Sequence, residues 1–98
     1  MGDIYTSGAW LVSGGHEQEF IDAWRDFVAF SRTMPGAGTF RLLRDVERAD
    51  HFISLGDWES LDAQRAWKET SEFMAGMRRV REHAELVPAV YELVAEVG

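Results

Sequence analysis

The feature that most constrains the fold is the order in which two hydrophobic periodicities follow each other along the chain. Residues 4–13, 39–46 and 51–58 are rich in β-branched and aromatic side chains that alternate between two faces, as β-strands do. Residues 86–97 alternate more weakly and predict a fourth strand. Residues 17–34 and 60–80 repeat apolar side chains at helical spacing. The predicted order is therefore strand, helix, strand, strand, helix, strand.

Both helical stretches have recognisable ends. Pro35 ends the first, because proline has no backbone N–H to donate. Ser60 is a favourable N-cap for the second, and Thr70 gives another capping signal, so we expect a break near Glu69. The apolar positions are Phe20, Ala23, Trp24, Phe27, Phe30 and Met34 in the first stretch, and Ala63, Ala66, Trp67, Phe73, Met74, Met77 and Val80 in the second.

This order predicts a particular α+β architecture for residues 1–98 as a single domain. Two strand-helix-strand units with right-handed crossovers place both helices on one face of a four-stranded antiparallel sheet, as in a ferredoxin-like sandwich. The other sheet face then has no cover within the chain, although the first and third strands carry apolar residues on both faces. We therefore expect a second copy to cover it in a homodimer.

Charge and composition exclude several classes of partner. The net charge of −7 argues against binding to nucleic acid or to anionic membranes, which both need a basic surface. No run approaches the ~20 apolar residues of a membrane span, and no basic-then-apolar leader begins the chain, so we expect a cytoplasmic protein. The chain has no cysteine, and its three histidines show no metal-ligand spacing. We therefore predict neither a metal nor a cofactor.

Several short motifs share their order and spacing with a known family. They are a Met-Pro-Gly turn at residues 34–36, Trp-Glu-Ser at 58–60, Ala-Trp at 66–67 and Ser-Glu-Phe at 71–73. The pattern resembles the antibiotic biosynthesis monooxygenase domain family over nearly the whole chain. The resemblance implies a dimeric α/β barrel in which two sheets pack face to face. It also implies an activity within a family that includes cofactor-independent oxygenases of phenols and quinols.

Two well-defined sites of that family are matched only in part. Haem-degrading members pair a first-strand Asn with a helical Trp and a His ten residues after it. Trp67 matches the Trp, but Met77 stands at the His position and the chain has no asparagine, so the resemblance implies no haem-degrading role. Quinone-forming members have an Asn four residues before the Trp and a Tyr six after it. Ala63 and Phe73 occupy those places, so both hydrogen-bonding groups of that pattern are missing.

A cofactor-free oxygenase needs an aromatic pocket with little water and a base or anion-stabilising donor, because the deprotonated substrate itself supplies the electron to oxygen. We predict that a small aromatic, quinol-like substrate contacts Trp24, Phe27, Phe73 and Met77. The predicted catalytic residues are Trp67, His83, Arg41 and Tyr5. Each has an ordinary alternative: the aromatic residues suit a helix–sheet core, and His83 suits a charged surface segment.

Two other functions fit the same pattern. A non-catalytic dimeric module that binds a small hydrophobic ligand needs the same pocket and no base. An isomerase or lyase acting on an oxygenated metabolite needs a polar pocket, which the sequence supports least.

Overall fold

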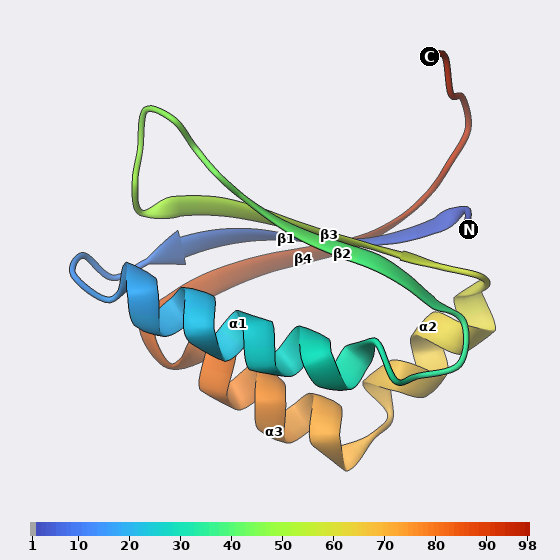
Figure 1. The fold of residues 1–98 in the computed structure, drawn as a ribbon, viewed down its shortest axis with the longest axis horizontal. Coiled ribbons are helices and arrows are strands. Elements are labelled where there is room, and N and C mark those ends of the chain that lie inside the picture. The colour runs from blue at the N-terminus through green and yellow to red at the C-terminus, as the bar shows by residue number, and fades with distance from the viewer. Residues whose placement is uncertain (1) are drawn as a thin grey trace.

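The computed structural model describes residues 2–98 and has the predicted order of elements. Four strands form one antiparallel sheet in the order β2-β3-β1-β4, and the helices cover one of its faces (Figure 1). The fold is thus the ferredoxin-like α+β arrangement. The strands are β1 (Ile4–Val12), β2 (Ala37–Arg44), β3 (His51–Trp58) and β4 (Ala84–Glu92). The helices are α1 (Glu17–Ser31), α2 (Leu61–Lys68) and α3 (Ser71–Val80), followed by the short 3₁₀ helix η1 (Arg81–His83).

The predicted break in the second helical stretch is confirmed. The Thr70 hydroxyl accepts a hydrogen bond from the backbone N–H of Phe73, so a new helix begins there. The Ser60 hydroxyl caps α2 in the same way, through the N–H of Ala63. Two short helices therefore follow β3, and the change of direction between them brings α3 against α1 (Figure 1).

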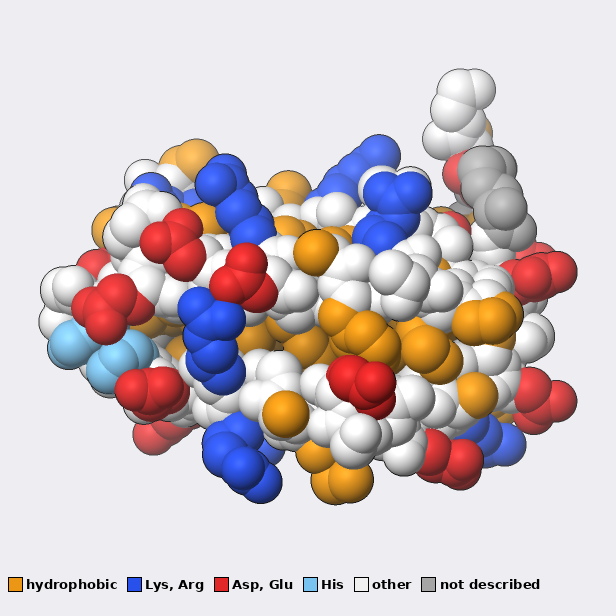
Figure 2. Space-filling view, turned by 60° about the horizontal axis from the view of Figure 1, so that its bottom comes forward, with side chains coloured by type: hydrophobic (Ala, Val, Ile, Leu, Met, Phe, Trp, Pro, Cys, Tyr) orange, Lys and Arg blue, Asp and Glu red, His pale blue; other side chains and the backbone are white. Residues whose placement is uncertain are grey.

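The helix-covered face of the sheet holds the hydrophobic core. Trp10 of β1 lies opposite Phe52 of β3 in the antiparallel register, and both are almost fully buried. Trp58, at the end of β3, has no exposed surface. The remaining buried apolar residues are Val12, Phe20, Ala23, Phe27, Trp67 and Val80. On the helical side, apolar side chains form a band between rows of charged ones (Figure 2).

The other face of the sheet, called the open face below, has no helix over it (Figure 1). Residues that alternate with the core positions point to this face. Its large apolar side chains are exposed by between 37% and 71% of their surface. They are Leu11, Leu43, Ile53, Leu55, Val87 and Tyr91.

The predicted bounds of β2 and β4 are wrong at both ends. The strand expected to continue to residue 97 ends at Glu92, because its partner β1 begins at Ile4 and offers nothing further to pair with. The N–H of Leu93 still donates to the Asp3 carbonyl, and the chain then leaves the sheet (Figure 1). β2 spans residues 37–44 rather than 39–46, because Asp45 begins the turn to β3 by accepting a hydrogen bond from the Glu47 N–H.

None of the helices formed by residues 2–98 is long and apolar enough to cross a membrane.

Candidate functional site

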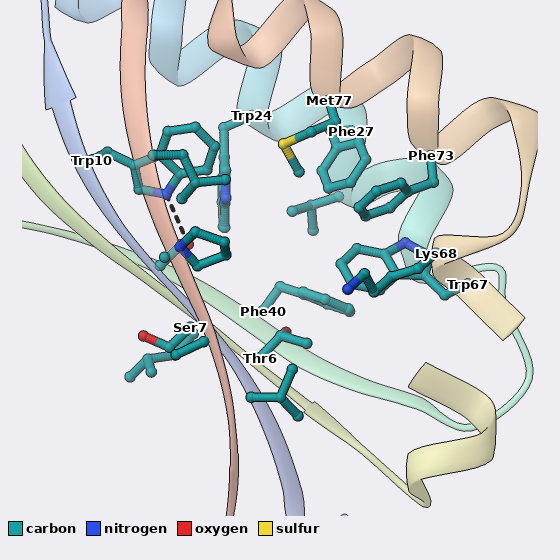
Figure 3. A pocket seen from close by; sticks show the side chains of 18 of the residues that line it. Thr6, Ser7, Trp10, Trp24, Phe27, Phe40, Trp67, Lys68, Phe73 and Met77 are labelled. Carbon is teal, nitrogen blue, oxygen red and sulfur yellow. Dashed lines mark hydrogen bonds between the residues drawn. The ribbon is translucent and has the colours of Figure 1, made fainter. Parts of the chain in front are cut away.

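A cavity of about 210 Å³ lies between the sheet and the helices (Figure 3). All three helices contribute to its wall, together with residues of all four strands, mainly β1 and β4. The lining includes every aromatic or methionine residue that the sequence predicted for a substrate pocket. These are Trp24, Phe27, Trp67, Phe73 and Met77, and Phe40 and Trp10 join them.

Aromatic rings in contact form one wall of the cavity. The Trp67 ring centre lies 4.7 Å from that of Phe73 and 5.7 Å from that of Phe27. On the other side it lies 4.8 Å from Trp58. Rings packed at these distances support one another in tilted and edge-to-face arrangements. The wall is therefore a rigid apolar surface.

The indole N–H of Trp67 is already engaged in a hydrogen bond. It donates to the Ser31 hydroxyl at 2.9 Å, and that hydroxyl donates to the Phe27 carbonyl, also at 2.9 Å. Ser31 is fully buried, so the arrangement is shielded from water. Trp67 consequently presents ring atoms, and not a free donor, to the cavity.

The sequence reasoning missed Gln64, the one buried polar residue on the cavity wall among residues 2–98. Its side chain is 2% exposed, one helical turn before Trp67. The buried side-chain polar atom that has no hydrogen-bond partner among residues 2–98 is Nε1 of Trp58, and not an atom of Gln64. Because Gln64 lines the cavity, its carboxamide can donate to or accept from a hydroxyl or carbonyl of a ligand. In the sequence, the spacing of three residues between Gln64 and Trp67 could have placed Gln64 on the same helix face as Trp67. The predicted apolar stripe included Ala66 instead, and Ala66 is exposed.

Two cations also line the cavity. Lys68 on α2 and Arg81 at the start of η1 are exposed, so the cavity reaches solvent beside them. Figure 3 shows the Lys68 side chain next to Trp67. No carboxylate or imidazole belongs to the lining within the described part of the chain. The cavity can therefore favour a ligand anion, but it holds no conventional general base.

Tyr5 and Arg41 do not reach this cavity. By register Tyr5 pairs with Asp57 and Tyr91, and Arg41 pairs with Leu55; all of these positions point to the open face. Neither Arg41 nor Arg44, which lie on opposite faces of β2, is a buried cation. Both are exposed, and Arg44 on the covered side places its guanidinium carbon 5.0 Å from the ring centre of Phe52 at the sheet edge.

His83 also lies outside the cavity, at the end of η1. Its imidazole stacks on that of His16 with ring centres 4.0 Å apart, and it faces Glu19 in the first turn of α1. The structure therefore brings together one of the four predicted catalytic residues, Trp67, with all four predicted pocket residues. Tyr5, Arg41 and His83 lie elsewhere.

Solved structures of several proteins share this fold at low sequence identity. SnoaB, a cofactor-independent oxygenase from Streptomyces nogalater, superposes with a TM-score of 0.87 at 19% identity, covering 98% of both chains. A conserved protein from Methanosarcina mazei gives a TM-score of 0.85 at 14% identity, covering 93% of this chain and 92% of its own. A protein of Deinococcus radiodurans, described provisionally as an antibiotic biosynthesis monooxygenase, also gives 0.85 at 14% identity, with 97% and 96% covered.

No curated protein matches the sequence. The model of one family does match it, over residues 5–79, which is more than half of the chain. That match extends from β1 through nearly all of α3 and so includes most of the cavity wall. This chain belongs to the antibiotic biosynthesis monooxygenase family.

Proposed function

We propose that this protein is a cofactor-independent monooxygenase that oxidises a small phenol or quinol in the cavity beneath the sheet. The observation that carries the proposal is an apolar aromatic cavity with one buried amide on its wall, Gln64, and two cations at its mouth. Membership of the family supports it. So does the shared fold with SnoaB, which is described as a cofactor-independent oxygenase.

The cavity volume limits the substrate. Pockets for drug-sized ligands are about 300–1,000 Å³, whereas a dry apolar cavity of about 150 Å³ can hold benzene. A volume of about 210 Å³ therefore suits a molecule of one or two aromatic rings. A larger polycycle needs part of its surface to remain outside, near Lys68 and Arg81.

The proposed reaction needs no cofactor because the substrate is the reductant. The phenol loses a proton, and the resulting anion transfers one electron to dioxygen. The radical pair combines to form a C–O bond, giving a hydroperoxide at a ring carbon that carries hydrogen. Loss of water from the hydroperoxide leaves a second carbonyl, so one oxygen atom enters the quinone and the other leaves in water.

The residues on the wall have distinct proposed roles. The aromatic side chains exclude water and hold the ring plane, which favours electron transfer to oxygen over side reactions. The Gln64 carboxamide orients a substrate oxygen by donating to it or accepting from it. Lys68 and Arg81 stabilise the substrate anion, and the proton leaves to water at the mouth.

A non-catalytic module that binds a small hydrophobic ligand is the second candidate. It is favoured by the lack of a carboxylate or imidazole on the cavity lining within residues 2–98. The two candidates share the cavity and differ in oxygen consumption. Ligand binding without turnover would support the module.

The deciding experiment measures oxygen uptake with dihydroxynaphthalenes, anthrone and simple hydroquinones, using heavy-isotope-labelled dioxygen. We expect protein-dependent uptake and one labelled oxygen atom in the quinone. Met77→Trp, which fills the cavity from α3, should abolish uptake. Met74→Trp is the matched control, because Met74 lies on the same helix, is 58% exposed and is not part of the cavity lining.

Two results would count against the oxygenase. Binding of these compounds without oxygen uptake would favour the module. Equal turnover by Met77→Trp and wild type would show that the reaction occurs outside this cavity.

We also propose that the protein is a homodimer in which two open faces pack together. Its support is the set of six large apolar side chains on one sheet face, since contiguous exposed apolar surface marks interaction sites. A self-complementary patch of this kind suits a twofold dimer. Tyr5 and Arg41 would then lie within that interface rather than in the cavity.

A further inference from the structure

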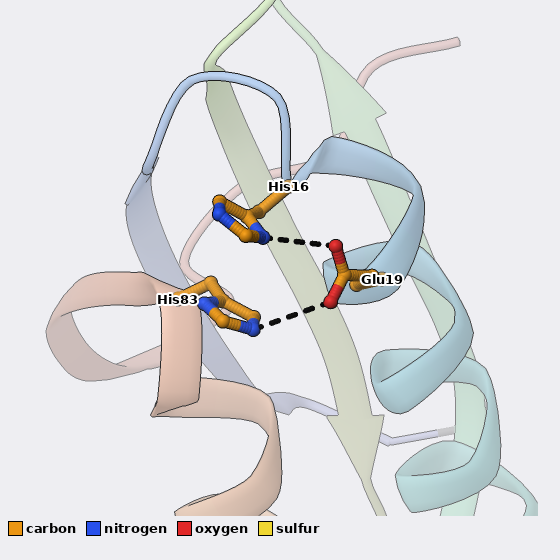
Figure 4. A group of neighbouring side chains, drawn as sticks. All are labelled: His16, Glu19 and His83. Carbon is orange, nitrogen blue, oxygen red and sulfur yellow. Dashed lines mark hydrogen bonds and ion pairs between the residues drawn. The ribbon is translucent and has the colours of Figure 1, made fainter.

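We propose that His16, Glu19 and His83 bind a divalent transition-metal ion of the Zn²⁺ type. The three side chains meet at one end of the helical layer, where the loop before α1 approaches η1 (Figure 4). They lie outside the cavity assigned to the substrate, so the proposal is independent of the oxygenase reaction. The two histidines are 67 residues apart in the chain, so no short metal-binding motif in the sequence indicates this cluster.

The ligand atoms already converge. Nδ1 of His16 lies 2.8 Å from Oε1 of Glu19, and Nε2 of His83 lies 3.3 Å from the other carboxylate oxygen. All three groups place a ligand atom within 4.8 Å of one another. Metal–ligand bonds of about 2.0–2.2 Å put the donor atoms of a tetrahedral site roughly 3.3 Å apart. Small rotations of three side chains that are not fully buried would bring them to that spacing.

The donor set selects the class of ion. Two imidazole nitrogens and one carboxylate oxygen suit Zn²⁺ and its neighbours, whereas Mg²⁺ and Ca²⁺ prefer all-oxygen sites. Three protein ligands leave a fourth position for water. Glu82 is a further carboxylate beside the site, with Oε1 3.8 Å from Nε2 of His83.

Backbone hydrogen bonds hold the two histidines together. The Ser13 N–H donates to the His83 carbonyl at 2.7 Å, tying the end of β1 to η1. The His16 N–H donates to the Ser13 carbonyl at 3.0 Å, and the Phe20 N–H donates to the His16 carbonyl at the start of α1. These bonds keep both rings on the same side of one short loop, stacked within 12° of parallel.

Charge at the site favours a cation despite the position of α1. The N-terminus of α1 contributes a partial positive charge of about half an elementary charge, which opposes cation binding. Glu19 and Glu82 each contribute a full negative charge next to the imidazoles. His83 itself is the last residue of η1, which follows α3 directly, so it lies at a helical C-terminus, where the partial negative charge favours a cation. The carboxylates therefore outweigh the N-terminal charge.

The proposal is tested by titrating Zn²⁺ into untagged protein by calorimetry and repeating the titration with Co²⁺, whose visible spectrum reports nitrogen ligation. We expect one Zn²⁺ per chain and a melting temperature that rises with Zn²⁺, because a ligand bound only to the native state stabilises it. His83→Ala should weaken binding at least about tenfold, and Glu19→Gln should do so while preserving side-chain shape.

His51→Ala is the matched control, since His51 is a partly exposed histidine near one carboxylate, Asp45, at 3.9 Å, and does not belong to the cluster. It should bind Zn²⁺ as the wild type does. Three results would overturn the proposal: no saturable binding to the wild type, unchanged affinity in both His83→Ala and Glu19→Gln, or equal loss in His51→Ala. Any of these would leave Glu19 as an ion-pair partner of two imidazoles and nothing more.

Discussion

The two faces of the sheet carry similar side chains and differ in what covers them. Phe52 and Ile53 are neighbours on β3; Phe52 is 2% exposed beneath the helices, and Ile53 is 39% exposed on the open face. Val87 on β4 is 71% exposed on that same face. Apolar composition alone therefore does not distinguish the interior of one chain from a surface that needs a partner. The helices make that distinction, and they cover only one side.

The contrast has an energetic consequence. Burial of apolar surface contributes roughly 25 cal/mol per Å², and on the covered face the chain obtains this contribution by itself. On the open face the apolar side chains make the same contribution only when a second molecule packs against them. Scattered exposed apolar residues are ordinary, but six on one sheet face form a patch. Stability of the covered face should thus be independent of protein concentration, and stability from the open face should depend on it.

The largest expected effect tests this contrast directly with two neighbouring residues. Phe52→Ala should lower the free energy of unfolding by about 3–5 kcal/mol at every protein concentration, because it leaves a cavity in the core. Ile53→Ala should lower it by an amount that grows as protein concentration rises, since its contacts exist only in the dimer. Urea denaturation at two concentrations measures both. Identical, concentration-independent losses would contradict the distinction between the faces.

The next effect concerns the interface alone. Ile53→Asp places a charge where the partner sheet would exclude water, and should weaken the dimer at least about a hundredfold. Val46→Asp is the control, because Val46 lies in the turn after β2 and is fully exposed. Sedimentation should give the mass of two chains for wild type and Val46→Asp, and of one chain for Ile53→Asp. A wild-type protein that sediments as a single chain at micromolar concentration would contradict the proposed dimer.

Much of the fold could be predicted from the sequence because its signals are local. The bounds of β3 were predicted correctly, as was the helix break at Thr70, where a hydroxyl caps the next helix. The end of β4 could not be predicted, because it depends on where β1 stops offering partners, a fact about another strand. A strand boundary that is set by pairing depends on residues far away in the sequence. The alternation of apolar and polar residues within 86–97 therefore does not indicate where the strand ends.

The site was predictable in its apolar part and not in its polar part. Trp24 and Met77 belong to apolar stripes at helical spacing. Because such stripes face the sheet, their residues also line a cavity between the helices and the sheet. Gln64 was missed because a polar residue within a helix is usually assigned to solvent; the buried side of α2 includes Gln64 beside Trp67, and Ala66 of the predicted stripe is exposed. His83 was considered alone because its neighbour His16 is distant in sequence.

A smaller effect compares a buried and an exposed hydroxyl near the end of α1, both on the helical side of the sheet. Ser31→Ala removes the acceptor for the Trp67 indole N–H and leaves it unpaired in the interior, which should cost about 1–3 kcal/mol of unfolding free energy. Thr33→Ala, close by in sequence, removes an exposed hydroxyl bonded to the Phe30 carbonyl and should cost less than about 0.5 kcal/mol. Thermal unfolding of both variants measures the difference. Equal losses of unfolding free energy in the two variants would show that the buried hydrogen bond stabilises the fold no more than the exposed one.

The smallest effect tests where the covered side meets solvent, at the mouth of the cavity. If the substrate reacts as its anion, the rate should rise with pH through the substrate's own pKa. A cation nearby lowers that pKa, so Lys68→Met should move the rising limb to higher pH, by about 0.5–1 unit because Lys68 is exposed and partly screened. Arg65→Met, a similar loss of charge on α2 away from the cavity lining, should leave the limb in place. Oxygen uptake between pH 6 and 11 measures both profiles, because this range includes the ordinary pKa of a phenol, about 10. Coincident profiles for the two variants would mean that Lys68 does not stabilise the reacting anion, and would leave Arg81 as the cation that does.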